Sequence, residues 1–307
     1  MKKRQLGSSD LYVSEIGLGC MSLGTAAVKA EAVIGTALEE GINYFDTADL
    51  YDFGENETII GQALKGVREK VIIATKAGNR WTEAKDSWTW DPSKAHIKEA
   101  AKQSLKRLNT DYIDLYQLHG GTINDNIDET IEAFEDLKSE GYIRYYGISS
   151  IRPNVIKEYV TKSHIDSVMM QYSILDRRPE EAALPLLNEN GISVVTRGTV
   201  AKGLLSDHLL GKASESVKKN GYLDYSYKEL QEVMSILKEK LATSRGLAEI
   251  AIQYNLAHPA TASVVAGASS VEQIKENARA SRSNPLTAEE INLIKSITKA
   301  NKYDQHR

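Results

Sequence analysis

The chain has 307 residues, of which 41% are hydrophobic and 26% charged, a balance that excludes a disordered protein and can supply a large core. The net charge at pH 7 is -4, from 38 Lys and Arg against 42 Asp and Glu. Because the two signs are interspersed, the sequence shows no electrostatic footprint for nucleic acid. We therefore expect a small molecule as the binding partner.

The sequence shows no signal for a membrane or a secreted protein. No run approaches the roughly 18 apolar residues of a membrane span, and the basic start of the chain is not followed by the apolar stretch of a signal peptide. Cys20 is the only cysteine, so an intrachain disulfide is excluded. None of the six histidines lies at metal-ligand spacing from another His or from Cys. We expect a cytoplasmic protein without a membrane contact or a metal site.

Short strands and helices alternate along the chain. A hairpin is expected at residues 5–13 around a Gly-Ser-Ser-Asp turn, and the first larger strand at 15–20. Further strands are predicted at residues 42–46, 71–76, 112–118, 143–149, 165–171 and 192–196. The helices between and after them are predicted at residues 29–40, 55–65, 93–108, 127–140, 153–162 and 179–190.

The alternation is interrupted at residues 197–245, which we expect to be a long loop with short helices. A helix at 247–257, an eighth strand at 262–266 and helices at 271–280 and 286–302 complete the chain. Eight strand and helix units predict a (β/α)8 TIM barrel with an N-terminal hairpin and an extra C-terminal helix. We expect residues 1–307 to form one domain.

Four chemically active side chains lie at or just past the ends of three predicted strands: Asp46, Tyr51, Lys76 and His119. Since parallel barrel strands end on one face, these side chains can converge. An ammonium group stabilises a phenolate, a carboxylate positions the ammonium, and an imidazole can hydrogen-bond a carbonyl oxygen. Each position alone is also compatible with a structural role, but the four together predict proton transfer to a carbonyl oxygen.

These residues match the Asp, Tyr, Lys and His tetrad of the aldo-keto reductases, and the sequence resembles that family over essentially its whole length. The resemblance implies NADPH-dependent reduction of aldehydes or ketones to alcohols, by hydride transfer from the nicotinamide. It implies that Tyr51 donates the proton, that Lys76 assists Tyr51 and that Asp46 pairs with Lys76. His119 would orient the carbonyl substrate.

The resemblance also implies cofactor contacts at several strand ends. Ser150 replaces a family Asn, and Met169 stands in place of a family Gln, whose contact Gln171 can take over from the same strand face. A basic residue common at the Gln273 position is absent, so Lys202 could supply that charge, and the strictness of the NADPH preference stays open. The complete implied set is Gly19, Cys20, Met21, Asp46, Ser149, Ser150, Gln171, Arg197, Gly198, Thr199, Lys202, Gly267, Ser269, Ser270, Gln273 and Asn277.

Arg197 stands where many members of this family have an aromatic ring stacked on the nicotinamide. A guanidinium can stack on a flat ring, but it adds positive charge beside a nicotinamide that is cationic when oxidised. The substitution therefore predicts a preference for the reduced cofactor. A salt-bridged surface arginine is the alternative interpretation.

All three tryptophans, Trp81, Trp88 and Trp90, lie in residues 78–92, after the third predicted barrel strand. They either form an apolar wall of the substrate site or pack a long loop onto the barrel rim. The sequence does not separate these two possibilities.

Two other functions are compatible with the sequence. The chain could be a cofactor-holding regulatory or sensor subunit with slow turnover, as are potassium-channel β-subunits that resemble this family. It could also be a barrel isomerase or lyase that forms a Schiff base at Lys76. The physiological substrate is not predicted, and the oligomeric state is left open, with a monomer favoured.

Overall fold

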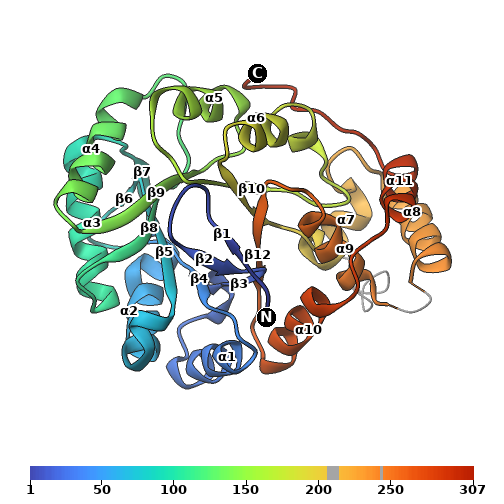
Figure 1. The fold of residues 1–307 in the computed structure, drawn as a ribbon, viewed down its shortest axis with the longest axis horizontal. Coiled ribbons are helices and arrows are strands. Elements are labelled where there is room, and N and C mark those ends of the chain that lie inside the picture. The colour runs from blue at the N-terminus through green and yellow to red at the C-terminus, as the bar shows by residue number, and fades with distance from the viewer. Residues whose placement is uncertain (206–213, 243–244) are drawn as a thin grey trace.

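The computed structural model describes residues 1–205, 214–242 and 245–307 and contains a closed barrel of eight parallel strands. The order around the barrel is β10, β11, β12, β3, β4, β5, β8 and β9, and helices form an outer ring around it (Figure 1). The predicted (β/α)8 barrel is therefore confirmed. The barrel strands are β3 (Ile16–Gly19), β4 (Tyr44–Asp46), β5 (Ile72–Ala77), β8 (Ile113–Leu118), β9 (Ile143–Ser149), β10 (Ser167–Gln171), β11 (Ser193–Arg197) and β12 (Thr261–Gly267).

The outer helices bury one apolar face each against the barrel. In α5, for example, Val155, Ile156 and Tyr159 are buried, at the spacing of one helix face. The helices that alternate with the strands are α1 (Ala27–Glu39), α2 (Glu55–Leu64), α3 (Lys94–Leu108), α4 (Ile127–Ser139), α5 (Pro153–Lys162), α6 (Ala183–Glu189), α9 (Leu247–Leu256) and α10 (Val271–Arg282). The short 3-10 helices are η1 (Cys20–Leu23), η2 (Tyr51–Gly54), η3 (Lys65–Lys70), η4 (Arg178–Glu180) and η5 (Ala201–Gly203).

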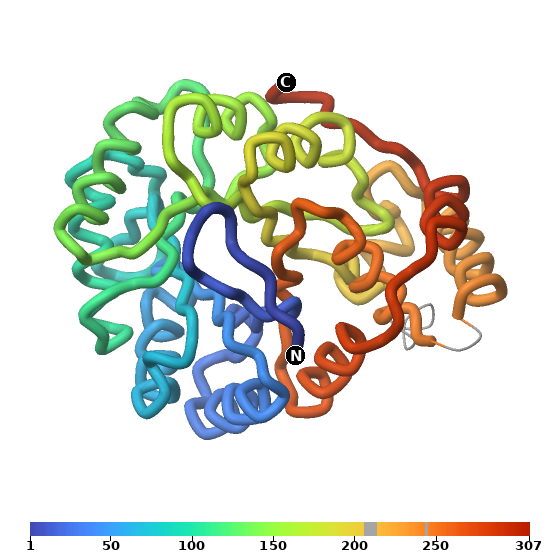
Figure 2. The backbone as a smooth tube through the Cα atoms, viewed as in Figure 1, coloured from blue at the N-terminus to red at the C-terminus, as the bar shows by residue number. Residues whose placement is uncertain are grey.

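An antiparallel hairpin, β1 (Lys3–Gln5) and β2 (Tyr12–Ser14), closes the N-terminal end of the barrel. Leu6 and Leu11 of this hairpin are buried in one cluster with Tyr44, Ile72 and Leu115, which lie near the starts of barrel strands. Figure 2 shows the hairpin as the blue tube lying over the middle of the barrel. The predicted hairpin is thus confirmed, and it leaves only the opposite end of the barrel open for a site.

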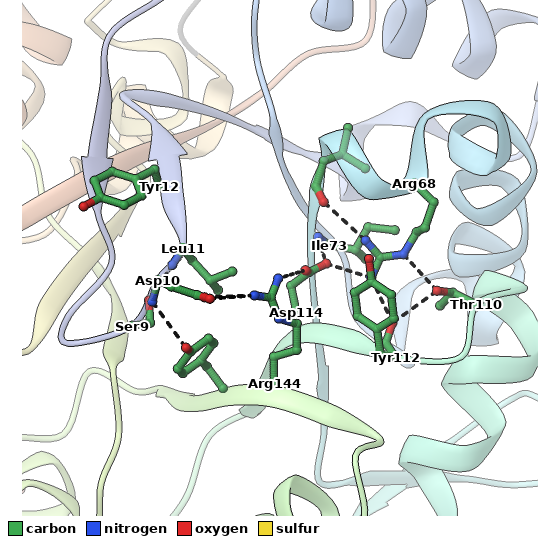
Figure 3. Close-up of polar contacts among 12 residues, drawn as sticks. Ser9, Asp10, Leu11, Tyr12, Arg68, Ile73, Thr110, Tyr112, Asp114 and Arg144 are labelled. Carbon is green, nitrogen blue, oxygen red and sulfur yellow. Dashed lines mark hydrogen bonds and ion pairs between the residues drawn. The ribbon is translucent and has the colours of Figure 1, made fainter.

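A chain of charged groups ties this hairpin to the barrel wall (Figure 3). Arg144 pairs with Asp10 at 2.9 Å and with Asp114 at 3.2 Å, and Asp114 pairs with Arg68 at 2.7 Å. The buried Asp114 carboxylate also accepts a hydrogen bond from the Ile73 backbone at 3.0 Å. Because these groups lie near the starts of β5, β8 and β9, the network is structural and lies away from the strand ends.

Two segments differ from the sequence prediction. Residues 78–92, expected as a loop, contain a second hairpin, β6 (Asn79–Trp81) and β7 (Trp88–Trp90). Residues 197–245, expected as a loop with short helices, contain α7 (Glu215–Asn220) and the 14-residue α8 (Tyr227–Lys240), while 206–213 and 243–244 lie outside the described residues. The signal for α8 was present, since Ser226 and Glu229 form a capping box before a buried stripe.

Two further boundaries are corrected. The predicted helix at 179–190 divides into η4 and α6, and the predicted C-terminal helix at 286–302 is α11 (Ala288–Ile297). Helix α11 ends where Thr298 adopts an extended backbone, and the Arg177 guanidinium donates to the backbone oxygens of Lys295 and Thr298 there at 3.1 and 3.2 Å. The chain beyond α11 continues along the rim of the barrel to the C-terminus (Figure 1). Within the described part of the chain, no helix is long and apolar enough to cross a membrane.

Candidate active site

The four predicted catalytic side chains meet at the C-terminal end of the barrel. Asp46 ends β4, Lys76 lies in β5, His119 follows β8 and Tyr51 begins η2. The Lys76 Nζ atom donates to Asp46 Oδ1 at 2.7 Å and lies 5.1 Å from the centre of the Tyr51 ring. The His119 ring stands edge-on to Tyr51 at 5.8 Å between centroids and 82°.

The Lys76 and Asp46 pair is buried, with 1% and 4% of the two side chains exposed. Burial lowers the pKa of Lys76, but the charge of Asp46, followed by Tyr51, more than offsets it, so the pKa is raised above its usual value. Burial raises the pKa of Asp46, and the Lys76 ammonium opposes this. The carbonyl of Thr47 accepts a second hydrogen bond from Lys76 at 2.7 Å. Lys76 is therefore held as an ammonium ion beside Tyr51 at neutral pH.

His119 is a neutral imidazole in this environment. Burial, and then the positive charges of Lys76 and Arg197, lower its pKa to about 3. Its Nδ1 atom is buried and has no hydrogen-bond partner among the described residues. A neutral ring with a free nitrogen can hydrogen-bond a substrate oxygen, whereas it holds no extra proton to give.

A pocket of about 840 Å³ opens over Tyr51 and His119. Its lining combines residues predicted from the sequence with residues that were not. The predicted ones are Met21, Tyr51, His119, Ser149, Ser150 and Arg197. The others include Leu50, Gly120, Gly121, Ile151, Arg152, Met169, Arg178, Tyr303, Asp304, Gln305 and His306.

Residues 303–306 of the C-terminal tail line the pocket, and Figure 1 shows the C-terminus near α5 and α6. The Asn154 backbone donates to the His306 carbonyl at 2.9 Å, and Arg307 pairs with Glu181. The Arg178 guanidinium lies 4.8 Å from the centre of the Tyr303 ring. No local signal in the sequence predicts that this tail lines the site, because its place depends on contacts with distant segments.

The remaining implied cofactor residues are spread along one side of the barrel mouth. Gly19 and Gly267 are register partners on β3 and β12. Ser270 caps α10 by accepting from the Gln273 backbone at 3.3 Å, and Gln273 in turn accepts from the Ser269 backbone at 2.7 Å. Asn277 lies one helical turn further along α10. These residues lie at the ends of β3 and β12 and along the first turns of α10, and they are not part of the pocket lining.

The end of β11 carries the rest of the set. Arg197 donates to the Gln171 side-chain oxygen at 3.3 Å, and Gln171 donates to the Tyr222 hydroxyl at 3.4 Å. Gly198 follows with φ +71°, where a Cβ atom would lie 3.2 Å from Gln171. The structure buries Thr199 and exposes Lys202. Met169, not Gln171, is the member of this strand face that lines the pocket.

Cys20 and the three tryptophans do not line this pocket. Burial, followed by the charge of Asp46, raises the pKa of the Cys20 thiol, which donates to the Leu18 carbonyl at 3.5 Å. Trp90 packs against Gly78 and donates to Asp125 at 3.0 Å, which is a structural role. Trp81 lines a separate cavity of about 200 Å³, and Trp88 is 52% exposed.

Comparison with known proteins agrees with the (β/α)8 barrel fold. Residues 15–299 match the model of the Aldo/keto reductase family. Over the full length of both chains, the sequence is 62% identical to the "Uncharacterized oxidoreductase YqkF" of Bacillus subtilis (strain 168). It is 31% identical to the "NADH-specific methylglyoxal reductase" of Escherichia coli (strain K12), over 98% of this chain and 99% of that protein.

Among solved structures, the chain resembles the holo form of the aldo-keto reductase AKR11C1 from Bacillus halodurans, with a TM-score of 0.94 and 61% identity over 100% of this chain and 99% of that chain. The apo form of the same protein gives a TM-score of 0.86 and 58% identity at the same coverage. The fold and site thus define a barrel oxidoreductase. The chain belongs to the aldo/keto reductase family.

Proposed function

We propose that this protein reduces aldehydes or ketones to alcohols with NADPH. The observation that carries the proposal is the position of Tyr51, which lines the pocket while the buried Lys76 ammonium contacts its ring. Members of the family use nicotinamide cofactors, and the greater similarity to a holo form is consistent with a site arranged for one. A cytoplasmic location and a single domain stay predictions.

The residues present fit such a cofactor. The pocket of about 840 Å³ can take the nicotinamide end together with a small substrate, and His119, which lines it, has a buried Nδ1 atom without a hydrogen-bond partner among the described residues. Ser149, Ser150 and Arg197, which line the pocket, would hold the nicotinamide end. The N-terminus of α10, with Ser269 and Ser270, would face the adenosine phosphate, because a helix N-terminus favours negative charge.

The protein's own part in the reaction is proton transfer and positioning. Bound NADPH supplies a hydride to the carbonyl carbon. Tyr51 donates its hydroxyl proton to the carbonyl oxygen, and the Lys76 ammonium stabilises the phenolate that remains. Asp46 and the Thr47 carbonyl hold Lys76 in place at 2.7 Å each. His119, as a neutral ring, hydrogen-bonds the same carbonyl oxygen and fixes its orientation.

A Schiff base at Lys76 is poorly compatible with this geometry. An amine must lose its proton before it can attack a carbonyl carbon. The raised pKa of Lys76 and its pairing with Asp46 oppose that loss. The proton-transfer function therefore remains the one we propose.

The test compares the parent protein with Tyr51→Phe, which removes the proton donor and keeps the ring. Titration with NADPH and NADH, followed by tryptophan fluorescence, measures cofactor binding, and absorbance of the reduced nicotinamide measures turnover of an aldehyde panel. We expect Tyr51→Phe to lose roughly 100-fold or more of the turnover rate while NADPH binding is retained. Tyr12→Phe is the control, since Tyr12 is 54% exposed at the opposite end of the barrel.

Three results would contradict the proposal. Unchanged turnover in Tyr51→Phe would remove the proposed proton donor. Tight cofactor binding without turnover in the parent protein would favour a regulatory or sensor subunit. Tighter binding of NADH than of NADPH would overturn the cofactor choice, which is a real alternative because one relative is named as NADH-specific.

A further inference from the structure

Three guanidinium groups line the pocket, and they differ in how they are neutralised. Arg178 makes two hydrogen bonds of 2.7 Å to the Asp176 carboxylate, so its charge is compensated. In the described part of the chain, neither Arg152 nor Arg197 has a carboxylate within ion-pair distance. The acid in the lining, Asp304, is exposed on the C-terminal tail. The pocket therefore carries an excess of positive charge close to Tyr51 and His119.

Arg152 is fixed beside the catalytic residues. It lies three residues after Ser149, the last residue of β9, and its backbone donates to the Ser150 hydroxyl at 3.2 Å. Its side chain donates to the carbonyl of Gly121, which stands two residues after His119. Two residues of chain span at most about 7 Å, so the guanidinium lies within reach of a small molecule that contacts His119.

The position of Arg152 separates it from the residues proposed for the adenosine phosphate. The barrel order places β8 directly opposite β12, and the side chain of Arg152 bridges the loops after β8 and β9. The residues proposed for the adenosine phosphate lie after β12 and on α10, across the barrel mouth. Arg197, which contacts Gln171, lies at the proposed nicotinamide end. The charge of Arg152 is thus available to the substrate and not to the cofactor phosphates.

A guanidinium presents five N–H donors in a planar fork, and a hydrogen bond to one backbone oxygen leaves most of them free. That fork matches the two oxygens of a carboxylate. We propose that Arg152 binds a carboxylate group of the substrate, so that the preferred substrates are short oxo acids with an aldehyde a few carbon atoms from the carboxylate. This inference rests on the proposed reductase function and adds a substrate class to it.

The experiment compares two four-carbon aldehydes, 4-oxobutanoate and butanal, which differ by the carboxylate. The parent protein is expected to have the higher kcat/KM for 4-oxobutanoate. Arg152→Gln should lower this value by roughly 10- to 100-fold, the range for loss of a hydrogen bond to a charged group, and should leave butanal nearly unchanged. Arg152→Lys keeps the charge without the fork and should recover part of the loss.

Lys157→Gln is the matched control. Lys157 is an exposed cation on α5, five positions from Arg152, and it does not line the catalytic pocket, so its removal changes the net charge equally. We expect the ratio of kcat/KM for the two aldehydes to stay unchanged in this variant. An equal change in both variants would show a general charge effect and would overturn the role of Arg152.

Calorimetric binding of 4-hydroxybutanoate and of 1-butanol gives a readout without turnover. Arg152→Gln should weaken the binding of 4-hydroxybutanoate by a similar factor and leave 1-butanol unaffected. If the parent reduces butanal without preferring 4-oxobutanoate, and Arg152→Gln changes neither measurement, the inference fails while the reductase function stands. If the parent reduces neither aldehyde, the proposed function fails, and the calorimetric comparison alone supports or overturns carboxylate binding by Arg152.

Discussion

Asp46→Asn tests whether the buried carboxylate compensates the charge of Lys76. The change keeps the size of the side chain and removes its negative charge, leaving an ammonium ion that is 1% exposed with only the Thr47 carbonyl at 2.7 Å as a strong partner. Removal of one partner of a buried ion pair costs about 3–5 kcal/mol. Because Asn can still accept a hydrogen bond from Lys76, we expect a loss near the lower limit, about 3 kcal/mol of the free energy of unfolding at neutral pH.

The loss should depend on pH in a defined direction. In the parent, the pKa of Lys76 in the folded state is raised above its usual value of 10.5, so its contribution is fully present below that pH and is lost as the pH rises through the folded pKa. In Asp46→Asn, burial is the largest remaining influence and lowers the pKa of Lys76. The unfolded chain then binds more protons, so the stability deficit should shrink as the pH rises from neutral towards 10.5.

Urea unfolding followed by circular dichroism at several pH values measures both effects. Asp136→Asn is the control, because Asp136 pairs with Lys94 and Lys98 at 2.8 and 3.1 Å on the surface. Exposed pairs contribute about 1 kcal/mol or less, and we expect no comparable pH trend. A deficit in Asp46→Asn no larger than that of Asp136→Asn, or one that is constant with pH, would refute the reasoning.

Three further changes test other parts of the molecule. Burial and nearby positive charges lower the pKa of His119 to about 3, so the folded protein loses stability as the pH falls below the usual pKa of 6.5. In urea unfolding, His119→Gln should remove about 3 kcal/mol of this loss between pH 7 and pH 4. An unchanged loss would show that His119 is not its source. Arg197→Trp should improve the affinity for the oxidised relative to the reduced cofactor by about fivefold in fluorescence titrations, and an equal ratio in the two proteins would contradict the charge argument. Asp114→Asn should cost about 3 kcal/mol of stability without lowering turnover, because the network in Figure 3 lies at the closed end of the barrel; reduced turnover at full folding would contradict that separation.

The fold was predictable because its signals are local. Each barrel strand is a short apolar run between helix-period segments, and such runs are recognised from a few neighbouring residues. The structure contains β4, β5 and β8 where these runs predict them, with Asp46, Lys76 and His119 at their ends. The one long helix missed, α8, also carries a local signal in its Ser226 and Glu229 capping box. The sequence therefore contains the information for α8.

The lining of the pocket was only partly predictable. Tyr51, Ser149 and Arg197 follow strand ends and were assigned to the site from the sequence. The tail residue His306 enters the pocket because its carbonyl binds the Asn154 backbone, a contact between segments 152 residues apart. Trp81, expected as a possible substrate contact, lines a separate cavity. Such placements depend on the packing of distant segments, which no short stretch of sequence encodes.

The sequence by itself determined the barrel and the residues of the tetrad, since the ends of parallel strands in a closed barrel must share one face. The tertiary structure alone decided which charges near that face are compensated. Asp46 neutralises Lys76 at 2.7 Å and Asp176 neutralises Arg178, whereas the Arg152 side chain donates to the carbonyl of Gly121 and has no carboxylate partner among the described residues. Compensation requires two groups within a few ångströms of each other, and that distance is set by the folded chain as a whole.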